Sequence, residues 1–172
     1  MDSFGQMVSI LITVLFLFFA PVFYMAQKQE MVVQTYVFTE TTLFLDNIRT
    51  SGRLTKNMYL TFMRKLEETN ILYDIKIEHL HKVFTPVYDD DNKEFKNDYS
   101  IHYYTVFEDD ILKEVLEGKG VYYMSEGDSI RVDIQNRTET LASKLKYFFH
   151  GEMDSSPKII VTYGGVIRNE DY

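Results

Sequence analysis

The sequence predicts an α+β fold in which a long N-terminal helix packs on a small antiparallel sheet, with additional short helices. Three observations predict this fold. The chain begins with an apolar run that carries no charge, a helical repeat of apolar residues continues beyond that run, and the repeat then shortens from 3.6 to 2 residues. We therefore expect an anchor at residues 1–27 and one α+β domain at residues 28–172.

The apolar run extends from Met7 to Ala26 and predicts a transmembrane helix. Twenty residues at 1.5 Å per residue cover about 30 Å, the thickness of the hydrocarbon core of a bilayer. Pro21 lies inside the run, where it removes one backbone hydrogen bond and tends to kink the helix. Membrane lipid is therefore the first expected partner.

A cleaved secretory signal and a buried soluble helix are the alternatives to an anchor. Against the signal, no Lys or Arg precedes the run, and cutting after either alanine would leave bulky Phe18 or Tyr24 where a small residue is needed. Lys28 is the only basic residue near either end of the run, so charge determines the orientation poorly. We expect the C-terminal domain to be extracytoplasmic.

The helical pattern continues beyond the anchor, with an apolar stripe at Val33, Val37, Phe44 and Ile48. This stripe predicts one continuous helix over residues 6–50, ended by Ser51-Gly52 in the manner of a C-terminal glycine stop. A second helix is expected over residues 55–69, where Met58, Tyr59, Phe62, Met63 and Leu66 form an apolar face.

The remainder of the domain is predicted to be mostly strands. Apolar and charged residues alternate from Tyr73 to Val83, which indicates a strand with one buried face. Residues 89–98 are expected to form an acidic loop, and residues 121–125 and 129–135 a hairpin across the glycine turn 126–128. Further strands are expected at residues 99–107 and 158–163, and helices at residues 108–117 and 138–150.

Composition excludes several classes of function. The net charge is −8, and lysines and arginines form no clustered basic face, so we expect no nucleic-acid partner. The chain contains no cysteine, which excludes disulfides, thiolate nucleophiles and cysteine-based zinc sites. Catalysis by an activated serine is not expected either, because no G-x-S-x-G signature is present.

Two segments have the residue types of a metal site. His79 and His81 lie two apart on a predicted strand, so both side chains project from one face, but a metal would need a third histidine or carboxylate ligand beside them. The sequence names no such ligand, and we expect histidines at the rim of the core. The stretch Asp89-Asp90-Asp91-Asn92 lacks the glycine and the glutamate of a calcium loop and is interpreted as a solvated turn.

Three further motifs have structural explanations. Glu126-Gly127-Asp128-Ser129 is interpreted as a turn, and Gly164-Gly165 is not a phosphate loop because no helix follows it. Asn136-Arg137-Thr138 fits the glycosylation sequon, but Thr138 is also expected to cap a helix. We therefore expect no catalytic, cofactor-binding or metal residues, no cofactor, and a protein that is not an enzyme.

The first fifty residues resemble those of type IV pilin-like proteins. A short N-terminus ending in Gly5 precedes the apolar run, and the helix continues into a small α+β head. In that family a membrane peptidase cuts after such a glycine, and the apolar helices bundle into a filament; Pro21 matches a proline that loosens the helix in many members. Ile10 stands where the family usually has glutamate. The layout looks most like minor pilins and pseudopilins of tight-adherence pilus systems in Gram-positive bacteria.

The resemblance implies a structural subunit of a pilus or secretion-type envelope assembly. Its partners would be other pilin-like subunits or copies of itself, and it would stay in the membrane or enter a surface filament. A single-pass membrane sensor or ligand-binding protein is the alternative, and such a protein would signal through a partner because only six residues precede the run. An anchored enzyme is a third hypothesis.

Overall fold

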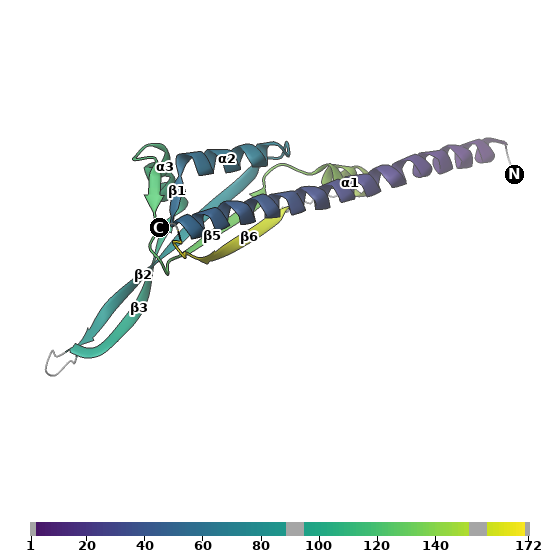
Figure 1. The fold of residues 1–172 in the computed structure, drawn as a ribbon. Coiled ribbons are helices and arrows are strands. Elements are labelled where there is room, and N and C mark those ends of the chain that lie inside the picture. Colours follow the sequence, from purple (N-terminus) through teal and green to yellow (C-terminus); the bar gives the residue numbers. More distant parts are fainter. Residues whose placement is uncertain (1–2, 89–94, 152–157, 171–172) are drawn as a thin grey trace.

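The computed structural model describes residues 3–88, 95–151 and 158–170. Its longest element is the helix α1, Ser3–Ser51, whose N-terminal part extends beyond the rest of the protein (Figure 1). The C-terminal part of α1 packs on a head of antiparallel sheets and short helices. The α+β fold predicted from the sequence is therefore confirmed.

The helix α1 is continuous through two features that disfavour a helix, a proline and a stretch of polar and β-branched residues. Pro21 lies inside it, and so do the polar and β-branched residues after Val33. Side-chain hydroxyls in this stretch donate to carbonyls one turn earlier instead of ending the helix; they belong to Thr35, Thr39, Thr41 and Thr42. Thr41 is fully buried, and its hydroxyl lies 2.6 Å from the Val37 carbonyl oxygen, so a polar residue enters the core without an unsatisfied group.

A tight reversal follows α1. Gly52 has a φ of 64°, a left-handed conformation that favours glycine, and its amide donates to the Ile48 carbonyl. The short strand β1, Arg53–Thr55, leads into the helix α2, Lys56–Glu67, which Thr55 caps by accepting a hydrogen bond from the Met58 amide. The predicted stop and the predicted second helix are both confirmed.

The main sheet has four antiparallel strands in the order β3-β2-β5-β6. Their bounds are Phe95–Phe107 (β3), Tyr73–Tyr88 (β2), Ser129–Asn136 (β5) and Ile160–Val166 (β6). The face that packs on α1 and α2 carries opposed pairs such as Ile77 with Val132. The core that results contains Leu45, Ile48, Leu54, Ile77, Ile111, Val115, Ile130, Val132, Ile134 and Ile159.

The predicted hairpin across residues 126–128 is wrong. The strand β4, Val121–Tyr123, pairs with β1 in a separate two-stranded sheet, where Leu54 lies opposite Tyr122. The strand β5 lies instead between β2 and β6, in register with residues Tyr73–Leu80. The alternating stretch of β2 offers β5 a far longer apolar partner than the three residues of β4, and this long-range pairing overrides the local turn.

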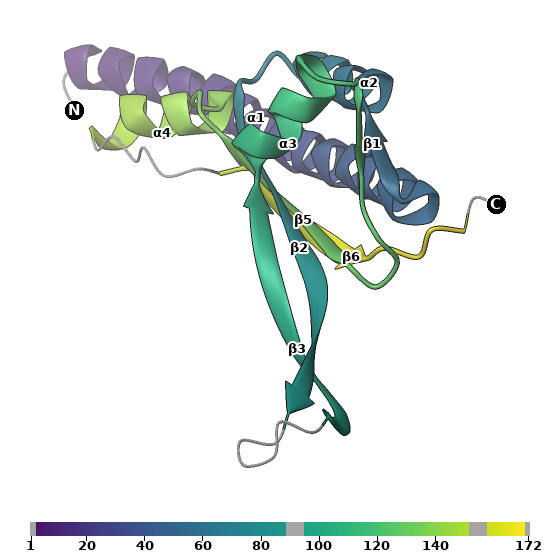
Figure 2. The same ribbon diagram turned by 90° about the vertical axis from the view of Figure 1, so that its left-hand side faces the viewer.

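Two short helices complete the head. The helix α3, Glu108–Leu116, follows β3, and the helix α4, Leu141–His150, lies beside the N-terminal half of α1 (Figure 2). Thr140 caps α4, so the predicted cap at Thr138 is wrong; Thr138 instead accepts a hydrogen bond from the Leu72 amide. Residues 95–98 belong to β3, not to the expected loop, and residues 89–94 lie outside the part described.

Candidate functional site

The most extensive exposed feature is the N-terminal part of α1. The large apolar side chains from Phe4 to Phe18 are between 39% and 78% exposed, so the described residues of the head leave them uncovered. Among the described residues, α1 is the one helix long and apolar enough to cross a membrane. A signal sequence would meet the same criterion, so the structure is compatible with the predicted span. In either role this surface must be covered by lipid or by other apolar helices.

The helix α4 packs on α1 next to this apolar region. The Thr140 hydroxyl donates to the Glu30 carboxylate over 3.3 Å, and the Phe148 ring stacks on the Phe19 ring with 6.3 Å between centroids. Two small residues, Ala26 of α1 and Ala142 of α4, are buried. The contact therefore places the C-terminal turn of α4 alongside the predicted span.

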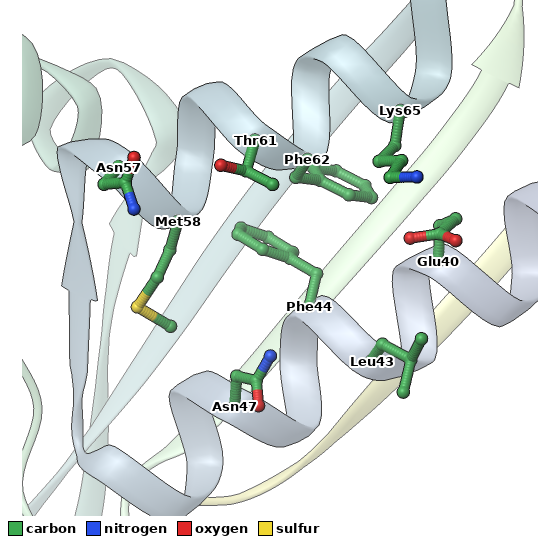
Figure 3. A pocket seen from close by; sticks show the side chains of 9 residues that line it. All are labelled: Glu40, Leu43, Phe44, Asn47, Asn57, Met58, Thr61, Phe62 and Lys65. Atoms are coloured by element: carbon green, nitrogen blue, oxygen red, sulfur yellow. The ribbon is translucent and has the colours of Figure 1, made fainter. Parts of the chain in front are cut away.

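A groove of about 290 Å³ separates α1 from α2 (Figure 3). The stacked rings of Phe44 and Phe62, 4.2 Å apart at their centroids, form its buried part. Glu40 and Lys65 lie at one end of the groove and Asn47 and Asn57 at the other. The opening is small and its lining mixed in charge, so it serves as the seam that holds α2 on α1.

The second candidate site is a polar cluster around the buried carboxylate of Asp128. His79 Nε2 lies 2.9 Å from Asp128 Oδ2, and His81 Nδ1 lies 3.0 Å from each Asp128 oxygen. The backbone amides of Lys82 and Ser125 donate to the same carboxylate over 2.9 and 2.8 Å. The cluster thus ties the turn before β5 to the middle of β2.

Burial and hydrogen bonding act in opposite directions on this carboxylate. Burial alone raises the pKa of Asp128, but hydrogen bonds from His81, from the amides of Lys82 and Ser125, and from His79 lower it below its ordinary value. Asp128 is 1% exposed and is ionised at neutral pH. On the far side of His79, Nδ1 lies 2.8 Å from the Tyr122 hydroxyl. The pKa of the Tyr122 phenol is raised, mainly by burial and to a smaller extent by the negative charge of Asp128.

The structure brings together some of the sequence candidates and separates others. His79 and His81 share one face of β2, as predicted, and residues 126–128 form a turn in which Gly127 has a φ of 86°. Sequence reasoning missed Asp128 as their neighbour, because no local pattern connects a turn aspartate with histidines 49 and 47 residues earlier. The aspartate stretch 89–92 falls in a part that the structure leaves undescribed.

The remaining motifs have structural roles. Asn136 is 9% exposed; its Oδ1 accepts from the amides of Lys158 and Ile159, and its Nδ2 donates to the Thr138 carbonyl. Three of the four hydrogen bonds that this side chain can make are formed within the head, so a glycan on this sequon would disrupt the fold. Gly164 and Gly165 lie within β6, where Gly165 leaves room for the Arg49 guanidinium.

A third feature is the β2–β3 hairpin, which projects from the head at the end away from the N-terminus (Figures 1 and 2). Beyond Leu80, β2 no longer pairs with β5, so the rest of the hairpin is a two-stranded ribbon. One face of this ribbon carries exposed large apolar side chains from both strands; they are Phe84, Tyr99, Ile101 and Tyr103. Such a face is typical of a contact surface.

Comparison of the chain with known protein families, with curated proteins and with solved structures finds no match.

Proposed function

We propose that this protein is a membrane-anchored structural subunit, similar to a minor pilin or pseudopilin, of a pilus or secretion-type envelope assembly. It acts through packing of its N-terminal helix and through contacts of its extracytoplasmic head. The observation that carries the proposal is the division of one helix, α1, between two environments. Residues up to Phe18 expose apolar side chains, whereas Val37, Leu45 and Ile48 of the same helix are completely buried in the head.

This division supports more than simple anchoring. A tether requires an apolar segment alone, and a flexible linker after it is sufficient. Here the apolar segment and the central element of the core are one unbroken helix of 49 residues, so a displacement of the N-terminal part moves the head with it. Such rigid coupling suits an assembly in which the position of each subunit is set by its neighbours.

The exposed face of α1 is also suited to helix–helix contact. Pro21 lacks an amide hydrogen, so the carbonyl one turn earlier must find another donor or water in the apolar environment. The Thr13 hydroxyl is already bonded to the Ser9 carbonyl within the helix, at 2.8 Å. Packing of apolar side chains therefore supplies most of the free energy of the helix association that we propose. The unpaired carbonyl near Pro21 offers one polar contact within it.

Single cysteines introduced from Ser9 to Ala26 test the proposal, because the native chain has no cysteine to interfere. We expect oxidative crosslinking in membranes at native expression to recur every three or four residues, as one helix face meets another. A cysteine replacing Leu60, which is exposed on the head, is the matched control for collisional crosslinking. Uniform or absent crosslinking along α1, together with full assembly by a version carrying an unrelated anchor, would reject the proposal.

A further inference from the structure

The Asp128 cluster contains the third metal ligand that the sequence alone did not identify beside His79 and His81. Asp128, in the turn before β5, is this ligand. One ligand atom from each of His79, His81 and Asp128 can be chosen so that all three lie within 4.8 Å of one another. We propose that these three residues bind one zinc ion per chain. This inference is independent of the function proposed above.

The two nitrogen–oxygen distances fit a zinc site after a small expansion, and the two histidine nitrogens lie within 4.8 Å of each other. Zinc binds imidazole nitrogen at about 2.0 to 2.1 Å and carboxylate oxygen at about 2.0 to 2.2 Å in tetrahedral geometry, which places its ligands about 3.3 Å apart. His79 Nε2 and His81 Nδ1 lie 2.9 and 3.0 Å from Asp128 Oδ2. Separating them by a few tenths of an ångström lets the ion replace the two hydrogen bonds.

The charges also favour a cation at this place. The carboxyl group of Asp128 is almost fully buried, and its ion-pair partners in the described chain are the two histidines, which are charged only when protonated. The ammonium of the adjacent Lys82 lies over the Phe84 ring instead, 4.8 Å from its centroid. Buried charges in proteins are paired or coordinate metals, and a divalent cation would neutralise this carboxylate.

The surroundings can hold both histidines in the form that zinc requires. A ligating His79 must carry its proton on Nδ1, and the Tyr122 hydroxyl 2.8 Å away can accept that proton's hydrogen bond. The two backbone amides continue to orient Asp128, while the His81 side chain, 42% exposed, leaves the fourth position to water. Two imidazoles and one carboxylate select zinc over calcium or magnesium, which prefer oxygen ligands.

The test uses the full chain in detergent micelles, purified without a polyhistidine tag and stripped of metal with a chelator. We expect titration calorimetry to give one zinc ion per chain and cobalt to give the visible bands of a tetrahedral site. Zinc in excess should raise the melting temperature, because a ligand that binds the folded state stabilises it by mass action. His81→Ala should reduce zinc affinity at least tenfold, and Tyr122→Phe about tenfold by removing the acceptor for His79.

His102→Ala is the matched control, since His102 is exposed on the same face of the neighbouring strand but lies outside the cluster. It should leave zinc binding unchanged. A second variant, Asp128→Asn, removes the carboxylate but alters a buried residue. His81→Ala keeps the proposal falsifiable even if Asp128→Asn does not fold, because the His81 side chain is 42% exposed. Absence of zinc binding, or equal binding by wild type and His81→Ala, would show that the cluster is held by hydrogen bonds alone and would overturn the proposal.

Discussion

The rings of Phe19 and Phe148 stack with 6.3 Å between centroids and 21° between planes, although 129 residues separate them in the chain. Phe19 lies seven residues inside the end of the apolar run at Ala26, which is about 10 Å along the helix. Phe148 is 72% exposed, and Tyr147 beside it is 50% exposed. If α1 spans the bilayer as proposed, the last turn of α4 reaches the lipid around it.

This relationship gives the first prediction. The chain contains no tryptophan, so Phe148→Trp introduces a single tryptophan whose fluorescence can be excited apart from that of the tyrosines. In nanodiscs whose lipids carry brominated acyl chains, we expect its fluorescence to be strongly quenched, because the ring stacks on Phe19 and would face lipid if α1 spans the bilayer as proposed.

Two matched variants separate the possible outcomes. Tyr123→Trp, at an exposed position in the head, should show no quenching, and Phe16→Trp within the apolar run should be quenched. Quenching at position 16 without quenching at 148 would refute the contact between α4 and lipid while keeping the span. Lack of quenching at both positions would refute the membrane span itself.

The second prediction concerns the seam between α1 and α2. Phe44 and Phe62 are 5% and 3% exposed and stack nearly parallel, at 4°, so each ring fills space that nothing else can fill (Figure 3). Phe62→Ala should lower the free energy of unfolding by about 3 to 5 kcal/mol, measured by urea denaturation in detergent. Leu60→Ala, on the exposed side of the same helix, should change it by less than about 0.5 kcal/mol. Equal effects of the two changes would contradict the seam.

Much of the fold could be predicted from the sequence because the relevant signals are local. The apolar stripe of α1, the glycine stop at Gly52 and the alternation in β2 each lie within one segment. The pairing of β4 with β1 could not be predicted, because three-residue strands carry no periodicity and their partner is about 70 residues away. Strand order depends on which long-range pairing buries more apolar surface, which a local pattern does not contain.

The third prediction concerns the close approach of β6 to β5. A methyl group on Gly164 would lie 2.8 Å from the Ile130 carbonyl oxygen, a backbone atom that cannot move aside. Gly164→Ala should therefore reduce the free energy of unfolding by about 1 to 3 kcal/mol in denaturant titrations. Gly5→Ala is the control, because nothing lies within 4 Å of its added methyl. A neutral Gly164→Ala would show that β6 does not pack this closely.

The fourth prediction is a pH dependence that arises at Glu108. Burial raises the pKa of this carboxyl, and the carboxylates of Asp109 and Asp74 raise it further. A carboxyl whose pKa is higher in the folded state stabilises the fold below its ordinary pKa of 4.5 and loses that contribution as pH rises through the raised value. Glu108→Gln should therefore gain stability relative to wild type as pH rises from 4 toward neutrality, measured as the difference in urea midpoints. Glu117→Gln, exposed beyond the other end of α3, should follow the wild type.

The candidate site was predictable only in part. The spacing of His79 and His81 correctly placed both imidazoles on one face, since side chains on a strand alternate. The turn glycine correctly predicted a reversal before Ser129. Asp128 points inward and accepts hydrogen bonds from both histidines because β5 pairs with β2, and this pairing is set by the tertiary structure. Local sequence rules therefore identified the histidines and the turn, but not that they lie next to each other.

The last prediction concerns the projecting part of the β2–β3 hairpin. Thr85 and Ser100 are directly opposed, and the described residues of the ribbon beyond them contribute nothing to the core. Replacing residues 86–99 by Asn-Gly joins this pair through a two-residue turn of the type that hairpins favour. The free energy of unfolding should change by less than about 1 kcal/mol, because the described residues that are lost lie outside the core and contribute only cross-strand pairs. Under the proposed function, the shortened chain should also form fewer crosslinked oligomers in membranes. The exposed apolar face keeps Phe84, Ile101 and Tyr103 but loses Tyr99 and the part of the ribbon beyond it. Tyr104→Ser, on the opposite face of the ribbon, is the control and should crosslink like the wild type. A large loss of stability would show that the ribbon belongs to the folding unit, and unchanged crosslinking would exclude its distal part from the contacts of the head.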